Sequence, residues 1–71
     1  MPDNYHWVSA DGEDFGRSNS LTYASRMAKR YSYDTSRFTA RPMQVVLNFG
    51  EPGQKLIEEH SAHPGRRWPE D

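Results

Sequence analysis

The fold is decided by one stretch of the chain, SLTYASRMAKRYSY at residues 20–33. Its apolar side chains recur at spacings of three and four residues, at Leu21, Ala24, Met27, Ala28 and Tyr31. These spacings place the side chains on one stripe of an α-helix. Ser18 and Ser20 are both suitable N-cap residues. We therefore predict a helix that ends near Tyr33, because Asp34-Thr35-Ser36 favours a loop.

The opposite side of the predicted helix is cationic. It carries Arg26, Lys29 and Arg30, with Tyr33 at its end, and Arg37 and Arg41 follow along the chain. Arginine pairs bidentately with acidic groups, and Arg and Tyr are frequent hot spots of protein interfaces. We therefore expect a partner-binding surface made by Arg26, Lys29, Arg30, Tyr33 and Arg37. A solvated helix face that binds nothing is the simpler alternative, and the sequence leaves both open.

A hairpin is predicted after the helix. Pro42 can begin a strand but not continue one, and Met43–Phe49 alternates in the manner of a strand. Gly50-Glu51-Pro52-Gly53 then favours a turn. The next segment, residues 54–60, is compatible with either a short helix or a second strand.

The register of the hairpin favours a strand for residues 54–60. A four-residue loop at Gly50–Gly53 places Leu47 opposite Leu56 and Val46 opposite Ile57. Apolar pairs then meet on both faces of the ladder, and such cross-strand pairs stabilise a hairpin. A helix would have only one Leu-Ile pair to anchor it, so we expect the strand.

Shorter elements are predicted toward the two ends of the chain. Residues 5–10 are rich in strand-favouring types, Asp11-Gly12 is a strong turn signal, and residues 15–17 return as a short strand. Further on, Pro64-Gly65 is a turn signal, and residues 66–68 are expected to form a brief edge strand.

These elements predict a single α+β domain over residues 1–71. A small antiparallel sheet of three to five strands packs on one α-helix, in the order β(β)αββ, because this is the simplest way to bury the apolar stripes. Residues 1–4 and 69–71 are expected to fray.

One helix covers only one face of such a sheet. With the leucines of the hairpin under the helix, Val46 and Ile57 turn to the other face, which Trp7 or Val8 shares. An exposed apolar patch rimmed by polar groups often marks an interaction site. We therefore expect an apolar interface at Trp7, Val46 and Ile57, which a homodimer would close. The alternative is that the tail folds back and covers this face with Trp68.

Composition narrows the function. The chain has 71 residues, no cysteine and a formal net charge of −1, so disulfides and thiolate chemistry are absent. Residues 1–14 carry four acidic and no basic side chains, whereas residues 15–43 carry six basic and one acidic. No apolar run approaches the roughly 20 residues of a membrane span, and the N-terminal residues are unlike a signal peptide. We expect a cytoplasmic protein.

Neither an enzyme nor a metal site is expected. His60 and His63 could share a zinc ion on a helix, but residues three apart on a strand point to opposite faces. Asp11, Glu13 and Asp14 lack the spacing of a calcium loop. The sequence has no nucleophile elbow and no phosphate-binding glycine loop. We therefore expect no cofactor and no catalytic residue.

A longer pattern spans residues 18–68: Ser20-Leu21, Ala24, Ala28, the strand Met43–Phe49, Gly53, Leu56-Ile57 and a late Trp68. In this pattern the chain resembles small phage-encoded α+β proteins, including some anti-CRISPR proteins that inhibit type I effector complexes. The resemblance implies a stoichiometric inhibitor that docks on a nuclease complex in the host cytoplasm and blocks DNA recognition. It assigns no contact residue.

We therefore expect a non-enzymatic phage or bacterial accessory protein that binds a protein partner with an acidic surface. The alternative is a small nucleic-acid-binding protein that uses the same basic side of the helix, since arginines contact phosphates and aromatic rings stack on bases. The slightly negative net charge counts against this alternative, because dedicated DNA-binding domains are usually basic overall.

Overall fold

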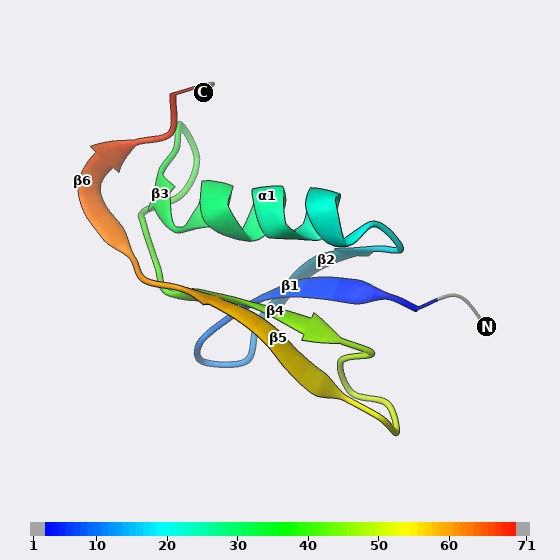
Figure 1. The fold of residues 1–71 in the computed structure, drawn as a ribbon. Coiled ribbons are helices and arrows are strands. Elements are labelled where there is room, and N and C mark those ends of the chain that lie inside the picture. The colour runs from blue at the N-terminus through cyan, green and yellow to red at the C-terminus, as the bar shows by residue number, and fades with distance from the viewer. Residues whose placement is uncertain (1–2, 70–71) are drawn as a thin grey trace.

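The computed structural model describes residues 3–69. These residues form six strands and one helix (Figure 1). In chain order the elements are β1 (Tyr5–Ser9), β2 (Asp14–Ser18), α1 (Leu21–Tyr31), β3 (Tyr33–Asp34), β4 (Met43–Leu47), β5 (Lys55–His60) and β6 (His63–Arg67). The expectation of fraying at residues 1–2 and 70–71 lies outside the described residues.

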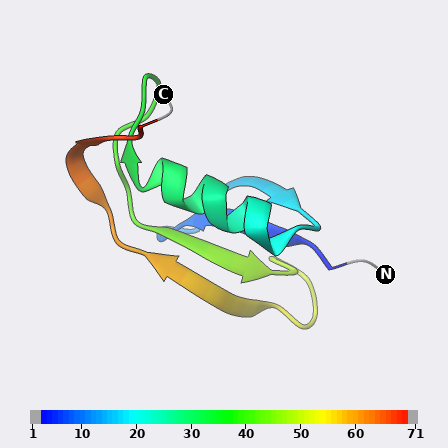
Figure 2. The ribbon, with the colours of Figure 1, turned by 45° about the horizontal axis from the view of Figure 1, so that its top comes forward.

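Four of the strands form an antiparallel sheet in the order β2-β1-β4-β5. Helix α1 lies across one face of this sheet, and the opposite face has no helix over it within residues 3–69 (Figures 1 and 2). β3 and β6 pair in parallel as a separate two-stranded sheet beside the C-terminal end of α1. The predicted α+β class is confirmed, and the chain is richer in strands than the predicted order.

Helix α1 begins where an N-cap side chain satisfies one of its free backbone donors. The Ser20 hydroxyl accepts a hydrogen bond from the Tyr23 amide at 3.2 Å. An N-cap of this kind contributes about 1 kcal/mol to stability. Of the two serines that the sequence offered, Ser20 is therefore the cap, and Ser18 instead ends β2.

The helix ends at Tyr31, earlier than predicted. Ser32 follows it and is fully buried, and its amide donates to the carbonyl oxygens of Ala28 and Lys29, both at 3.1 Å. Its hydroxyl donates to the Lys29 carbonyl oxygen at 2.6 Å. Ser32 is the C-cap of the helix, and Tyr33 begins β3. Tyr33 therefore does not belong to the cationic helix face, which corrects the prediction.

The core lies between α1 and the sheet. At its centre are five buried residues, Trp7, Ala24, Ala28, Met43 and Val45. Partly buried side chains surround them: Tyr5, Phe15, Met27, Tyr31 and Ile57. Full burial of a side chain such as valine or methionine contributes about 1.5–3 kcal/mol. The apolar stripe predicted for the helix is thereby confirmed, except that Leu21, at the first turn, is 37% exposed.

The hairpin of β4 and β5 is confirmed as two strands, but both of its predicted cross-strand pairs are wrong. Near the turn, Val46 pairs with Leu56 instead of Ile57, and Leu47 pairs with Lys55. The register shifts between Val45 and Val46, so Ile57 is the extra residue of a β-bulge. Beyond the bulge the ladder follows the predicted register.

The bulge changes which apolar side chains face away from the helix. Ile57 packs against the helix-side core, and Trp7 lies in that core with only 6% of its surface exposed. Val46 does face the other way, but it is 4% exposed, and Leu56 beside it is 47% exposed. The predicted apolar interface of Trp7, Val46 and Ile57 is therefore wrong as a surface patch.

The start of β1 is tied to the turn after β4. The Asn48 amide donates to the Asn4 carbonyl oxygen at 2.8 Å. The Asn4 amide in turn donates to Asn48 Oδ1 at 3.3 Å. These two hydrogen bonds satisfy backbone groups at the start of β1.

Replacing Gly16 with alanine tests how closely β2 packs on Trp7. A Cβ at this residue would clash with the Trp7 ring at Cζ2 and Cε2, and overpacking costs about 1–3 kcal/mol. We expect Gly16→Ala to lower the free energy of unfolding by that amount in a urea titration. Gly53→Ala is the matched control, because Gly53 also has a positive φ of 87° but its Cβ would meet nothing within 4 Å. Equal losses in the two variants would contradict the packing argument.

Candidate binding surface

After β5 the chain leaves the main sheet and runs beside the C-terminal end of α1 as β6 (Figures 1 and 2). The His63 amide donates to the Ser32 carbonyl oxygen at 2.7 Å, and the Trp68 amide donates to the Asp34 carbonyl oxygen at 2.9 Å. β6 is thereby fixed alongside β3. It starts three residues earlier than the predicted edge strand at residues 66–68.

Aromatic rings fill the space along this pairing. The Tyr33 ring stacks on His63 with a centroid distance of 4.3 Å and contacts Trp68 at 5.6 Å. Trp68 is only 9% exposed. The sequence left open whether Trp68 covers the uncovered face of the main sheet, and the structure instead places it against Tyr33.

The Asp34 carboxylate joins three segments. One oxygen accepts from the Ala40 amide at 2.8 Å, and the other accepts from the Gly65 amide at 3.1 Å. The first bond fixes the loop that leads to β4, and the second fixes the middle of β6. The predicted turn at Pro64-Gly65 is wrong, because both residues lie within this strand. Both oxygens are thus engaged by backbone donors.

Cationic side chains gather around this pairing from three parts of the chain. They come from the last turn of α1, the loop after β3 and the end of β6, and together they are called the basic end: Lys29, Arg30, Arg37, Arg66 and Arg67. Three neighbouring hollows connect them, of about 470 Å³ with Lys29, Arg66 and Arg67, about 400 Å³ with Arg37 and Arg67, and about 430 Å³ with Arg30 and Arg37.

Three of these cations have no partner within residues 3–69 that balances their charge. Within residues 3–69, the side chains of Lys29, Arg37 and Arg66 make no hydrogen bond or ion pair. All three residues are exposed. Arg30 and Arg67 do have partners, so the uncompensated charge at the basic end belongs to the other three.

The structure brings together some of the predicted partner-binding residues. Lys29, Arg30 and Arg37 all join the basic end, whereas Arg26 lies one turn earlier and lines none of the three hollows. Tyr33 lines one hollow from β3 rather than from the helix. Arg41 is not part of this surface, because its guanidinium lies over the rings of Phe15 and Phe38 at 5.1 and 5.2 Å.

Sequence reasoning missed Arg66, Arg67 and Trp68 as neighbours of the helix cations. The signal was present, since two arginines and a tryptophan follow Pro64-Gly65. Nothing in the sequence indicated that this segment would pair in parallel with β3, because that strand is only two residues long.

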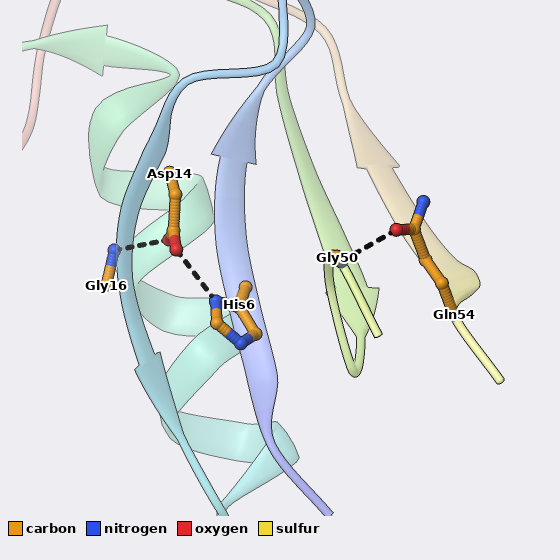
Figure 3. A network of polar contacts seen from close by, with 5 residues as sticks. All are labelled: His6, Asp14, Gly16, Gly50 and Gln54. Atoms are coloured by element: carbon orange, nitrogen blue, oxygen red, sulfur yellow. Dashed lines mark hydrogen bonds and ion pairs between the residues drawn. The ribbon is translucent and has the colours of Figure 1, made fainter. Parts of the chain in front are cut away.

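A second polar cluster lies on the face of the sheet away from α1. His6 Nδ1 lies 3.0 Å from Asp14 Oδ2, and Asp14 Oδ1 accepts from the Gly16 amide at 3.0 Å (Figure 3). The same figure shows Gln54 closing the turn before β5, where its side chain accepts from the Gly50 amide at 2.8 Å. No hydroxyl of the described residues is hydrogen bonded to the His6–Asp14 pair, so it lacks the nucleophile of a catalytic triad.

A third polar cluster joins α1 to β5. Glu58 Oε1 accepts from the Ser25 hydroxyl at 2.7 Å and lies 3.0 Å from His60 Nε2. The Ser25 hydrogen bond, and then the contact with His60, hold the pKa of the Glu58 carboxyl below its ordinary value of 4.5. Ser25 and His60 both contact the Glu58 carboxylate and not each other. The histidine therefore does not activate the serine hydroxyl as a nucleophile.

Residues 3–69 contain neither a metal-binding cluster nor a helix that could span a membrane. No group of three or more His, Cys, Asp or Glu residues between residues 3 and 69 is arranged to hold a metal ion. His60 contacts Glu58 and His63 stacks on Tyr33, so each has its own neighbour. The one described helix is too short and too polar to cross a membrane.

Comparison of the chain with protein-family models, with curated proteins and with solved structures finds no match. The resemblance to small phage-encoded proteins therefore stays a prediction.

Acid titration tests the Ser25–Glu58–His60 cluster. A carboxyl with a lowered folded-state pKa stabilises the fold above its unfolded pKa, and that stabilisation is lost as pH falls through the folded pKa. We expect Glu58→Gln to be less stable than wild type near neutral pH and to lose less stability between about pH 7 and pH 3. Glu59→Gln, on the same strand but exposed, should follow the wild-type curve. Parallel curves for Glu58→Gln and wild type would contradict the assignment.

Removing the Asp34 carboxylate tests what orders the basic end. Hydrogen bonds to charged groups contribute about 1.5–3 kcal/mol each, so we expect Asp34→Ala to lower the free energy of unfolding by about 2 kcal/mol or more. Hydrogen exchange measured by NMR should accelerate most at the Ala40 and Gly65 amides. Glu59→Ala serves as a control without such bonds. Unchanged exchange at both amides would show that other contacts hold these segments.

Proposed function

We propose that this chain is a non-enzymatic binding protein whose basic end docks on an acidic surface of a protein partner. The observation that carries the proposal is the uncompensated charge of Lys29, Arg37 and Arg66 around an ordered aromatic ribbon. Arginine and aromatic side chains are the residue types that most often dominate interface energies. Three exposed cations from three separate segments of a small domain form such a surface.

The order of the basic end supports binding. The Asp34 carboxylate and the Tyr33 stack hold the loop and β6 in place. Groups that are already fixed lose little conformational entropy when a partner arrives. The backbone segments that carry the cations are therefore held in place, although the cationic side chains themselves are long.

Protein is favoured over nucleic acid as the partner by the aromatic packing. Single-stranded nucleic acid is bound by rings with a free face on which a base can stack. The Tyr33 ring already stacks on His63 and contacts Trp68, and Trp68 is nearly buried. The formal net charge of −1 points the same way, since nucleic-acid-binding domains are usually basic overall.

In its most specific form the proposal follows the resemblance to small phage-encoded proteins. The chain would then be a stoichiometric inhibitor that covers an acidic surface of a host complex. The basic end is suited to such a role, because charge complementarity gives speed and specificity of association without any catalytic group.

Charge reversal tests the proposal. We expect Lys29→Glu combined with Arg66→Glu to abolish capture of the partner from the native cell, measured by affinity capture and quantitative mass spectrometry. Reversed charges opposite an acidic surface replace attraction with repulsion. The matched control is Arg17→Glu combined with Lys55→Glu, which makes the same change in net charge at exposed residues of β2 and β5.

Two results would contradict the proposal. Equal capture by both double variants would exclude the basic end as the docking surface. Loss of the captured protein after nuclease treatment, together with a steep dependence of binding on salt, would indicate that nucleic acid is the partner.

A further inference from the structure

One hollow of the basic end combines cations with apolar groups. It has a volume of about 470 Å³ and is called the Trp68 hollow, lined by Lys29, Tyr33, Gly65, Arg66, Arg67, Trp68 and Pro69. Ligand-binding pockets commonly measure about 300–1,000 Å³. The hollow is therefore large enough for a whole side chain of a partner, and far larger than a single small anion requires.

The charge of the Trp68 hollow matches a dianion. Lys29 and Arg66 line it and make no hydrogen bond or ion pair within residues 3–69, so two positive charges are uncompensated there. A phosphate monoester carries about −1.5 to −2 charge at neutral pH, whereas a carboxylate carries one. The Gly65 amide is already bonded to Asp34, so the cationic side chains would hold the anion.

The rest of the hollow matches an apolar stem on that anion. Trp68 and Pro69 line it together with Tyr33, and the long alkyl chains of Lys29 and Arg66 add apolar surface. Among possible stems an aromatic ring gains most from such a wall, because rings bury a large apolar area. A ring that ends in a phosphate satisfies both parts of the hollow at once.

We propose that the Trp68 hollow receives a phosphotyrosine side chain of the protein partner. This inference rests on the proposed function and names the group by which the partner is recognised. Phosphotyrosine is favoured over a nucleotide because the proposed partner is a protein, and because the formal net charge of −1 counts against a nucleic-acid partner.

The two tryptophans provide a direct readout. Trp7 Nε1 is buried in the core and has no hydrogen-bond partner among the described residues, whereas Trp68 lines the hollow. In the ¹H–¹⁵N NMR spectrum of the full chain, each indole gives one signal. A capped phosphotyrosine tripeptide should shift the Trp68 indole signal to saturation and leave the Trp7 signal in place. The unphosphorylated tripeptide should shift neither, and inorganic phosphate should bind at least about tenfold more weakly because it lacks the ring.

Single substitutions test which cations bind the phosphate group. Lys29→Gln and Arg66→Gln should each weaken binding of the phosphotyrosine tripeptide by about tenfold or more, the usual effect of losing a charged hydrogen bond. Lys55→Gln, an exposed lysine at the start of β5, should bind as wild type does. An unshifted Trp7 signal in each variant shows that the core is intact.

Four results would overturn the inference: no shift of the Trp68 signal by the phosphotyrosine tripeptide, equal affinity for inorganic phosphate, equal weakening by Lys55→Gln, or tighter binding of AMP than of the tripeptide. The proposed function would survive each of them if the Lys29→Glu and Arg66→Glu double variant still loses its captured protein. The two proposals therefore fail separately.

Discussion

The rest of the structure depends on how closely helix α1 lies on Trp7. Ala24 and Ala28 present small side chains to the sheet, and both are fully buried. Their size lets the helix approach the strands while the large Trp7 ring fills the core. Close packing of this kind leaves little freedom for the helix to shift. The position of the last helical turn, and of everything attached to it, is therefore set from within the core.

The end of the helix then organises the binding surface. Ser32 closes the helix and offers its carbonyl oxygen to His63, which brings β6 next to β3. Asp34 and the Tyr33 ring complete the attachment. Cations that are more than thirty residues apart in the sequence, such as Lys29 and Arg66, thereby line one hollow. The proposed docking function needs this attachment, since the same cations on loose segments would have to be ordered by the partner.

Much of the fold could be predicted from the sequence because local patterns agree with it. The apolar spacing of residues 21–31 specifies the helix, and residues 55–60 form the expected strand although the cross-strand pairs predicted for it were wrong. The register near the β4–β5 turn could not be predicted, because β4 ends at Leu47 and a bulge at Ile57 absorbs one residue. That one residue moved Ile57 from the open face to the core. Trp7 was misplaced for a related reason, since alternation alone does not say which face of a strand the helix covers.

The sequence by itself determined the helix and the strands of the main sheet, the N-cap at one of two serines, and the group of cations at the end of the helix and in the loop after it. Tertiary structure alone decided that Arg66, Arg67 and Trp68 join that group, and that Tyr33 is packed between rings rather than displayed on the helix. The physical reason is the range of the interactions. Helix spacing and hairpin pairing depend on residues that are close in the sequence. The β3–β6 pairing instead joins short, distant segments, which can meet only after the helix has packed on the sheet.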